Sequence, residues 1–346
     1  MIKKHRNKDR GFYIQWDSTN DCNLSCSHCY HNFGKIKDKS KQSKTMTLEE
    51  IVYMLDDLNQ TCDRWNFNPI FNISGGECLL RPDLFKIINY SISRGIETRL
   101  MTNGTLLDIE KANELKRLGV LSVQISIDGD KETHNRVRGR NWAYNKAMEG
   151  IGNCYIAGLH VTVSTTLMKQ NASQIKFVVT EAIKNRASGV GFQTLVPNPL
   201  LGANDPEFLN CFEIKKAYEE IDKLREIYKG KIQVYTSEIL WHLFRNKTNT
   251  QSSYQGGCSA GFGGLSVLAD GTVYACRRLP ISVGHITEGI INLVTKKPLM
   301  KELRDNRKKQ RTYCSDAPYC GGCRAIAYAT TGDYLNKDPT CFKHLI

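Results

Sequence analysis

The chain of 346 residues lacks several features that would assign it to common classes. It has no run of about eighteen apolar residues, so we expect no membrane-spanning helix. Its first residues, Met1 to Arg6, do not lead into the apolar segment of a secretory signal. We therefore expect a cytoplasmic protein with few disulfides. Hydrophobic residues make up 40% of the chain, which favours a folded protein over a disordered one.

The chain has a formal charge of +13, from 48 lysines and arginines against 35 acidic residues. Basic residues concentrate in three segments, 3–10, 35–44 and 301–311. No aromatic-interleaved basic motif accompanies them, so a solvated basic surface is favoured over nucleic-acid binding. An anionic substrate or an acidic peptide would fit the same charge.

Apolar strands alternate with capped helices from residue 11 to about residue 230. We predict six strands, near residues 12–16, 69–73, 97–101, 120–127, 160–165 and 189–196. Six consecutive strand–helix units predict an α/β fold with a parallel sheet, most simply a partial (βα)6 TIM-like barrel. A doubly wound sheet is the alternative, but no Gly-x-Gly-x-x-Gly motif follows the first strand.

Local signals place several boundaries. Capping boxes at 47–50 and 171–174 predict helix starts, and Asp205-Pro206 predicts another. After about residue 240 the pattern changes to short strands, glycines and cysteines, with a hairpin signal at Asp270-Gly271. We therefore divide the chain into a barrel domain, 1–240, and a small cysteine-rich iron–sulfur domain, 241–346.

Thirteen cysteines are many for a protein of a reducing compartment, and most of them lie in two groups. Cys22, Cys26 and Cys29 have the spacing to wrap one iron–sulfur cluster. A zinc site is the alternative, with His28 or His31 as the fourth ligand. This segment follows the first strand, so it lies at the carboxyl end of the sheet, where α/β folds hold their chemistry.

Polar motifs also follow the later strands. They are Ser74-Gly75-Gly76-Glu77, Thr102-Asn103-Gly104, Ser126-Ile127-Asp128-Gly129, Thr165 or Thr166, and Gln193. Each alone is commonly an ordinary turn. Five on one rim predict a binding site.

Cys22-x3-Cys26-x2-Cys29 followed by Ser74-Gly75-Gly76-Glu77 resembles the radical S-adenosylmethionine (SAM) superfamily. The resemblance implies a partial (βα)6 barrel and a [4Fe-4S] cluster on these three cysteines, with SAM chelating the fourth iron. It implies SAM contacts from His28, Gly75, Gly76, Glu77, Asn103, Ser126, Asp128, Arg138 and Gln193. Of these, Gly75, Gly76 and Glu77 would meet the methionine amine, and Arg138 the carboxylate. Cys78 stands where the family usually has proline, and we interpret it as a packing residue.

The second group, Cys258, Cys276, Cys314, Cys320, Cys323 and Cys341, resembles the SPASM extension of radical SAM enzymes, which usually holds two auxiliary [4Fe-4S] clusters. The resemblance assigns Cys258, Cys276 and Cys323 to one cluster and the other three to a second. Arg311 stands where the pattern has a cysteine, so each set is one thiolate short. A non-cysteine ligand, an open iron, a single auxiliary cluster or zinc knuckles are the alternatives. We expect Cys62, Cys154 and Cys211 to be packing residues.

The resemblance implies an enzyme that reductively cleaves SAM and abstracts hydrogen with the 5′-deoxyadenosyl radical. We favour modification of a peptide or protein. Action on a small molecule, as in tetrapyrrole or quinone cofactor synthesis, is the alternative, and a non-catalytic iron–sulfur or zinc protein is a third. A flavodoxin- or ferredoxin-type donor would supply electrons. Because only 21 residues precede Cys22, a separate peptide-recognition protein is an expected partner, and segments 35–44 and 301–311 are candidate surfaces for an acidic leader. The catalytic acid or base stays unassigned.

Overall fold

The computed structural model describes residues 6, 10–32, 44–236, 238–245, 257–309, 314, 316 and 320–346, without the side chains of 244, 245 and 306–309. Arg311 and most of the basic segments 3–10 and 35–44 lie outside these residues. No helix in the described ranges combines the length and the apolar character needed to cross a bilayer.

One sheet of ten strands organises the described chain, in the order β10-β9-β8-β1-β2-β3-β4-β5-β6-β7. The strands are β1 Gly11–Asp17, β2 Asn68–Ser74, β3 Glu97–Thr102, β4 Ser122–Ser126, β5 Val161–Leu167, β6 Gly189–Thr194, β7 Gln233–Thr236, β8 Gly264–Val267, β9 Thr272–Cys276 and β10 Leu279–His285. Strands β1 to β7 are all parallel to their neighbours. The partial parallel barrel predicted from the sequence is therefore confirmed, with β7 as a seventh strand that the pattern missed.

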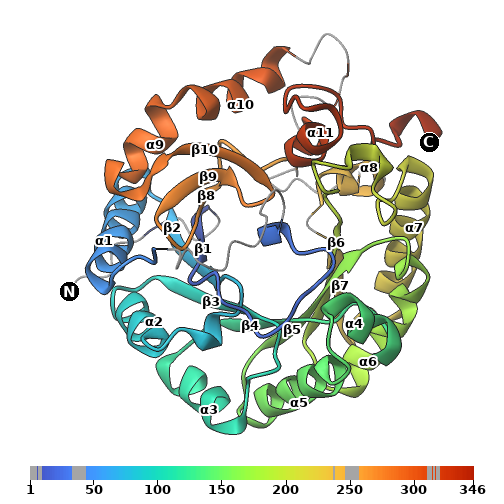
Figure 1. Cartoon of the computed structure of the whole chain (residues 1–346), viewed down its shortest axis with the longest axis horizontal. Coiled ribbons are helices and arrows are strands. Elements are labelled where there is room, and N and C mark those ends of the chain that lie inside the picture. The colour runs from blue at the N-terminus through green and yellow to red at the C-terminus, as the bar shows by residue number, and fades with distance from the viewer. Residues whose placement is uncertain are drawn as a thin grey trace.

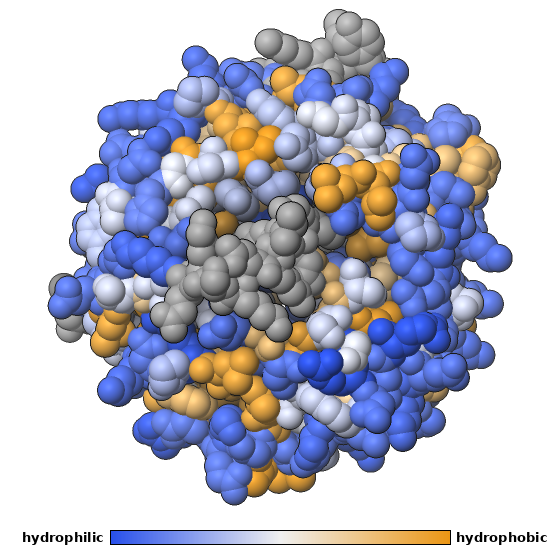
Figure 2. Space-filling model, viewed as in Figure 1, coloured by the Kyte–Doolittle hydropathy of each residue, from blue (hydrophilic) through white to orange (hydrophobic). Residues whose placement is uncertain are grey.

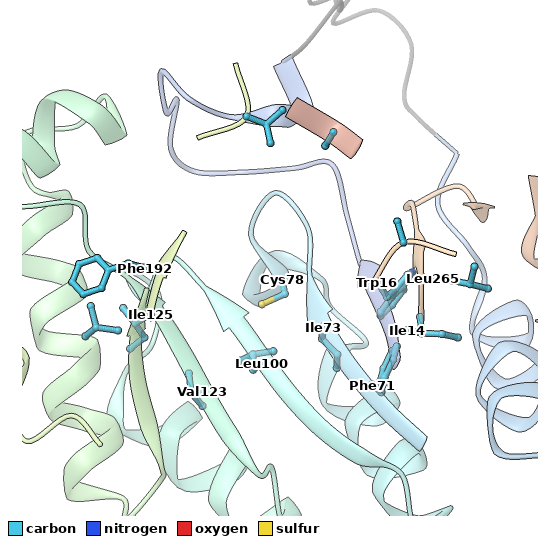
Figure 3. Packing of buried hydrophobic residues seen from close by; sticks show 14 of the residues in the cluster. Ile14, Trp16, Phe71, Ile73, Cys78, Leu100, Val123, Ile125, Phe192 and Leu265 are labelled. Carbon is cyan, nitrogen blue, oxygen red and sulfur yellow. The ribbon is translucent and has the colours of Figure 1, made fainter. Parts of the chain in front are cut away.

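Helices surround this sheet (Figure 1). They are α1 Leu48–Trp65, α2 Leu84–Ser93, α3 Ile109–Leu118, α4 Lys131–Arg138, α5 Ala143–Ile156, α6 Ile175–Lys184, α7 Cys211–Ile227, α8 His242–Arg245, α9 Ile290–Lys296, α10 Pro298–Lys309 and α11 Arg324–Thr331. The capping box that opens α1 forms as predicted, between Thr47 and Glu50. Apolar side chains fill the space between sheet and helices; Trp16 of β1, for example, stacks on Phe71 of β2 with ring centroids 5.7 Å apart (Figure 3).

The region after residue 240 extends the same sheet. Strand β8 pairs parallel with β1, and β9 and β10 follow as antiparallel strands. The predicted hairpin at Asp270-Gly271 is therefore present between β8 and β9. The division at residue 240 falls within the short helix Ile239–Trp241, and the sheet is continuous across it.

The helix start predicted at Asp205-Pro206 is wrong, and the start predicted at 171–174 is present without its predicted capping box. Helix α7 begins at Cys211 with a capping box of Asn210 and Glu213, because the carboxylate of Asp205 instead accepts bonds from the backbone N–H groups of Asn198 and Glu207. Asn171 stands before the 3-10 helix Ala172–Gln174, which continues into α6, but its side chain makes no capping hydrogen bond. Its amide donates to the backbone carbonyls of Asp128 and Thr166 and joins the ends of β4 and β5.

The helix α4 was not predicted, although Asp130 caps its start and Gly139, at φ 70°, ends it. The exterior on the face shown in Figure 2 is largely hydrophilic, with small apolar patches separated by polar side chains. The described apolar side chains mainly pack within the sheet–helix layers.

Candidate active site

A cavity of about 310 Å³ lies at the carboxyl ends of the parallel strands. It brings together residues from the cysteine segment, from the ends of β2, β3, β4, β5 and β6, and from the link between β9 and β10. Of the residues predicted for the site and its rim, it is lined by Cys22, Cys26, Cys29, His28, Ser74, Gly75, Gly76, Thr102, Asn103, Ser126, Arg138, Thr166 and Gln193. Motifs scattered over some 170 residues therefore share one site because parallel strands end at one edge.

The cysteine segment is fixed on the end of α4. The backbone N–H groups of Ser25 and Ser27 donate to the carbonyls of Arg138 and Val137, at 3.2 and 2.9 Å. The N–H of Cys29 donates back to the carbonyl of Cys26 at 3.3 Å. These bonds hold the loop with its three thiols against the cavity.

The Gly75-Gly76 turn packs directly on the cysteine segment. The N–H of Gly76 donates to the carbonyl of Thr19 at 2.7 Å, and that of Glu77 to the carbonyl of Asp21 at 2.8 Å. A Cβ atom at position 76 would lie 2.7 Å from the carbonyl carbon of Asp21, and Gly75 has a φ of 137°. Both positions therefore require glycine.

The carboxylate of Glu77 is held by the protein and is not among the residues lining the cavity. It accepts bonds from the Thr102 hydroxyl at 2.7 Å and from the backbone N–H groups of Asn103 and Leu79, at 2.9 and 3.1 Å. Burial raises its pKa, and these hydrogen bonds oppose the rise. The neighbouring Cys78 is fully buried and points its thiol at the Met101 carbonyl, 3.4 Å away. Glu77 thus ties the ends of β2 and β3 together, and a role at the methionine amine stays a prediction.

Asp128 does not line the cavity but binds Arg138, which does. The Arg138 Nε donates to Asp128 Oδ2 at 2.7 Å, and its Nη1 lies 3.7 Å from the Cys26 sulfur. Burial alone would raise the pKa of Asp128, but the Arg138 guanidinium holds that pKa below its usual value. Arg138 lines the cavity, whereas Asp128 lies behind it, fully buried.

His28 contributes a polar atom without a partner in the described structure. Its Nδ1 is buried and makes no hydrogen bond. Burial lowers the pKa of His28 to about 4, so the ring is neutral near pH 7. Because His28 also lines the cavity, its unsatisfied ring nitrogen is consistent with a ligand completing the site.

A second cavity, of about 610 Å³, lies between β1, β7 and the C-terminal segment. Cys258, Cys276 and Cys323 all line it. The other three C-terminal cysteines gather separately: the thiols of Cys314, Cys320 and Cys341 interact electrostatically with one another. The six cysteines thus form two groups of three, and the Lys343 Nζ lies 3.8 Å from the Cys314 sulfur.

Three residues line both cavities: Gln193, Arg277 and Arg278. The two arginines form the link between β9 and β10 and were not predicted as site residues. Arg278 donates to the Thr194 carbonyl at 3.1 Å and to the buried carboxylate of Glu238 at 3.3 Å. The sequence feature that could have identified these two arginines as site residues is their position directly after Cys276.

These residues fit iron–sulfur clusters and SAM. All thirteen cysteines are free thiols. Burial raises the pKa of Cys22 to about 11 and that of Cys320 to about 12, so thiolates there need a strongly positive partner such as iron. Within the described residues no three His, Cys, Asp or Glu side chains converge on a single metal ion. A cluster makes no such demand, because each thiolate binds a different iron atom.

The chain matches family models in both regions. Residues 16–182 match the model of the Radical SAM superfamily, and residues 258–324 match SPASM, an iron–sulfur cluster-binding domain. The chain belongs to the radical SAM superfamily. It is a radical SAM enzyme with a C-terminal SPASM domain, and its cofactors are SAM and [4Fe-4S] clusters, with at least one auxiliary cluster in the SPASM domain.

Three curated relatives illustrate the breadth of this radical SAM family. The AdoMet-dependent heme synthase of Methanosarcina barkeri is 28% identical over 343 residues, covering 95% of each chain. The Fe-coproporphyrin III synthase of the same organism is 29% identical over 97% of this chain and 88% of its own length. The mycofactocin maturase MftC of Mycobacterium tuberculosis is 26% identical over 97% of this chain and 84% of its own.

Among solved structures, native anSMEcpe with bound AdoMet has a TM-score of 0.74 to this radical SAM enzyme at 19% identity, covering 96% of this chain and 94% of that one. At that identity the likeness shows the fold. It agrees with the partial barrel described above.

Proposed function

We propose that this radical SAM enzyme acts on an iron tetrapyrrole that carries carboxylate side chains. The observation that carries the proposal is the charge of the first cavity: arginines line it, and no aspartate or glutamate does within the described residues. Relatives named heme synthase and Fe-coproporphyrin III synthase align over nearly the whole chain. Haem and coproporphyrin both bear propionates, which suit such a cavity.

The residues have distinct roles in this proposal. Cys22, Cys26 and Cys29 would hold the cluster, and Gly75 and Gly76 would let SAM approach the backbone at the end of β2. Asn103, Ser126, Arg138, Gln193 and the orphaned His28 would complete the SAM pocket, with Glu77 and Asp128 supporting it from behind. When bound, the cluster and SAM supply the 5′-deoxyadenosyl radical. The cavity within the partial barrel would limit the access of water to that radical.

The first test asks whether SAM is cleaved at the assigned site. Wild type, Cys26→Ala and Cys154→Ala are reconstituted anaerobically and given SAM and a strong reductant. We expect 5′-deoxyadenosine from wild type and from C154A, whose thiol is buried in α5 without other partners, and none from C26A. Cleavage by C26A would overturn the cluster assignment.

The second test identifies the substrate class. We expect Fe-coproporphyrin III to increase 5′-deoxyadenosine formation and to be converted to a tetrapyrrole of different mass, detected by mass spectrometry. Failure of a set of iron tetrapyrroles with propionates to stimulate cleavage would overturn the proposal. We propose a cytoplasmic location, which fits the thirteen free thiols, and a flavodoxin- or ferredoxin-type electron donor.

Modification of a peptide is the second candidate, favoured by the 26% identity to the maturase MftC over 97% of the chain. It would involve a short peptide substrate and, as a partner, a separate peptide-recognition protein. The same assay with a peptide encoded beside the gene decides between the two: a peptide mass change without tetrapyrrole turnover would favour this candidate.

A further inference from the structure

Arg277 differs from the other cavity arginines in its partners. Arg138 is bonded to the buried Asp128, and Arg278 to the buried Glu238. No carboxylate of the described residues forms an ion pair with Arg277. Of the three arginines that line the first cavity, Arg277 is therefore the one whose charge no carboxylate neutralises within the part of the chain that the structure describes.

The guanidinium of Arg277 is nevertheless held in a defined place. Its Cζ lies 5.3 Å from the centre of the Tyr30 ring, a cation–π arrangement. Tyr30 is itself fixed by its hydroxyl, which donates to Asp17 Oδ1 at 3.2 Å. The face of this ring therefore positions the guanidinium. An aromatic face leaves the guanidinium N–H edge available to a planar anion.

Its position also suits substrate contact. Arg277 is half-buried and lines both the cavity with Cys22, Cys26 and Cys29 and the cavity with Cys258, Cys276 and Cys323. A substrate that reacts beside SAM and extends toward Cys258, Cys276 and Cys323 would contact Arg277. A guanidinium that is partly removed from water binds a carboxylate well, through two parallel hydrogen bonds.

We propose that Arg277 is the specificity-determining residue that binds a propionate carboxylate of the tetrapyrrole substrate, held for that purpose by Tyr30. This rests on the proposed function. Arg278 has a different task, since its bonds to Thr194 and Glu238 join β6 to the segment before α8.

The test compares equilibrium binding of Fe-coproporphyrin III and of its neutral tetramethyl ester to the anaerobically reconstituted holoenzyme with SAM, followed by porphyrin absorbance. Wild type should bind the acid more tightly than the ester. Arg277→Gln should weaken acid binding about 10- to 100-fold and leave ester binding unchanged. Arg277→Lys should retain part of the preference, since it keeps the charge without the planar pair of donors.

Arg136→Gln is the matched control. It removes the same charge from an exposed face of α4, and Arg136 lines neither cavity. Iron content, SAM affinity and substrate-free SAM cleavage should be equal in wild type and R136Q, and the same quantities are measured in R277Q. An unchanged acid-over-ester preference in R277Q would overturn the role of Arg277 and leave the proposed function standing. Loss of iron or of SAM binding in R277Q with that preference intact would assign Arg277 to the cofactors instead. Failure of wild type to bind either porphyrin would overturn the proposed function itself, and this inference with it.

Discussion

Arg138 and Asp128 form a buried ion pair at the end of β4, with Nε and Oδ2 2.7 Å apart. Arg138 comes from the last turn of α4, whose backbone also holds the cysteine segment. The pair therefore connects the barrel sheet to the loop that carries Cys26. The charge of Arg138 matters because its guanidinium lies near the sulfur of Cys26, which would be a thiolate ligand of the cluster.

We expect Asp128→Asn to destabilise the fold by about 3–5 kcal/mol, because it leaves the Arg138 charge buried without its partner. The measurement is anaerobic urea denaturation of the reconstituted protein. Glu132→Gln is the control, because Glu132 lies in α4, the helix that carries Arg138. Its side chain is 3.9 Å from Arg136 on an exposed surface, and that ion pair contributes at most about 1 kcal/mol to stability. Equal effects of D128N and E132Q would show that the buried pair carries no special weight.

His134 should make stability depend on pH. Burial, with a contribution from Arg138, lowers its pKa from 6.5 to about 4 in the folded chain. Between these values the unfolded state binds a proton that the folded state does not. Stability is therefore complete above about pH 6.5 and falls by about 1.4 kcal/mol per pH unit as the pH decreases toward 4.

The test is His134→Asn. In the wild-type chain the backbone N–H of Asp128 donates to His134 Nδ1 at 3.2 Å, and the asparagine side chain keeps an acceptor for that N–H. The difference in unfolding free energy between wild type and variant should shrink as the pH falls from 6.5 to 4. A constant difference over this range would mean that the substitution changes packing alone and that His134 does not titrate as inferred.

Gly76→Ala tests the contact between the glycine turn and the cysteine segment. The added methyl group would overlap the Asp21 backbone, so the loop must move, at a cost of about 1–3 kcal/mol. We expect lower iron incorporation and weaker SAM binding, measured by iron analysis and calorimetry. Gly152→Ala in α5 is the control, because its methyl group would meet no atom within 4 Å and alanine favours a helix. Normal iron and SAM binding in G76A would contradict the tight fit described here.

Local sequence patterns predicted the strands and the edge at which their polar ends meet, because strand alternation and parallel connection are local rules. They failed where long-range contacts decide the structure. Strand β8 pairs with β1 across most of the chain, and β7 is a short strand of four residues. Asp205 carried a valid cap signal, but a turn with Asn198 competed for its carboxylate. Arg277 was missed because its place depends on Tyr30, from the opposite end of the sequence.

The two groups of C-terminal cysteines make distinct predictions for iron content. If Cys258, Cys276 and Cys323 hold one cluster and Cys314, Cys320 and Cys341 a second, wild type should bind about twelve irons, four for each of three clusters. Cys258→Ala and Cys314→Ala should then each lower the count by about four, because a cluster with two thiolates left is poorly held. Cys62→Ala, which removes a thiol buried in α1, should leave the iron unchanged.

A single auxiliary cluster built on Cys258, Cys276, Cys320 and Cys323 predicts otherwise: about eight irons in wild type, and no loss in C314A. The structure favours the first outcome, because Cys314 lies with Cys320 and Cys341 and its sulfur is near the Lys343 ammonium, which would offset the charge of a cluster. Lys343→Met should therefore lower the occupancy of the second cluster in an iron analysis while C258A does not affect that cluster. An unchanged iron count in both C314A and K343M would establish the single-cluster arrangement.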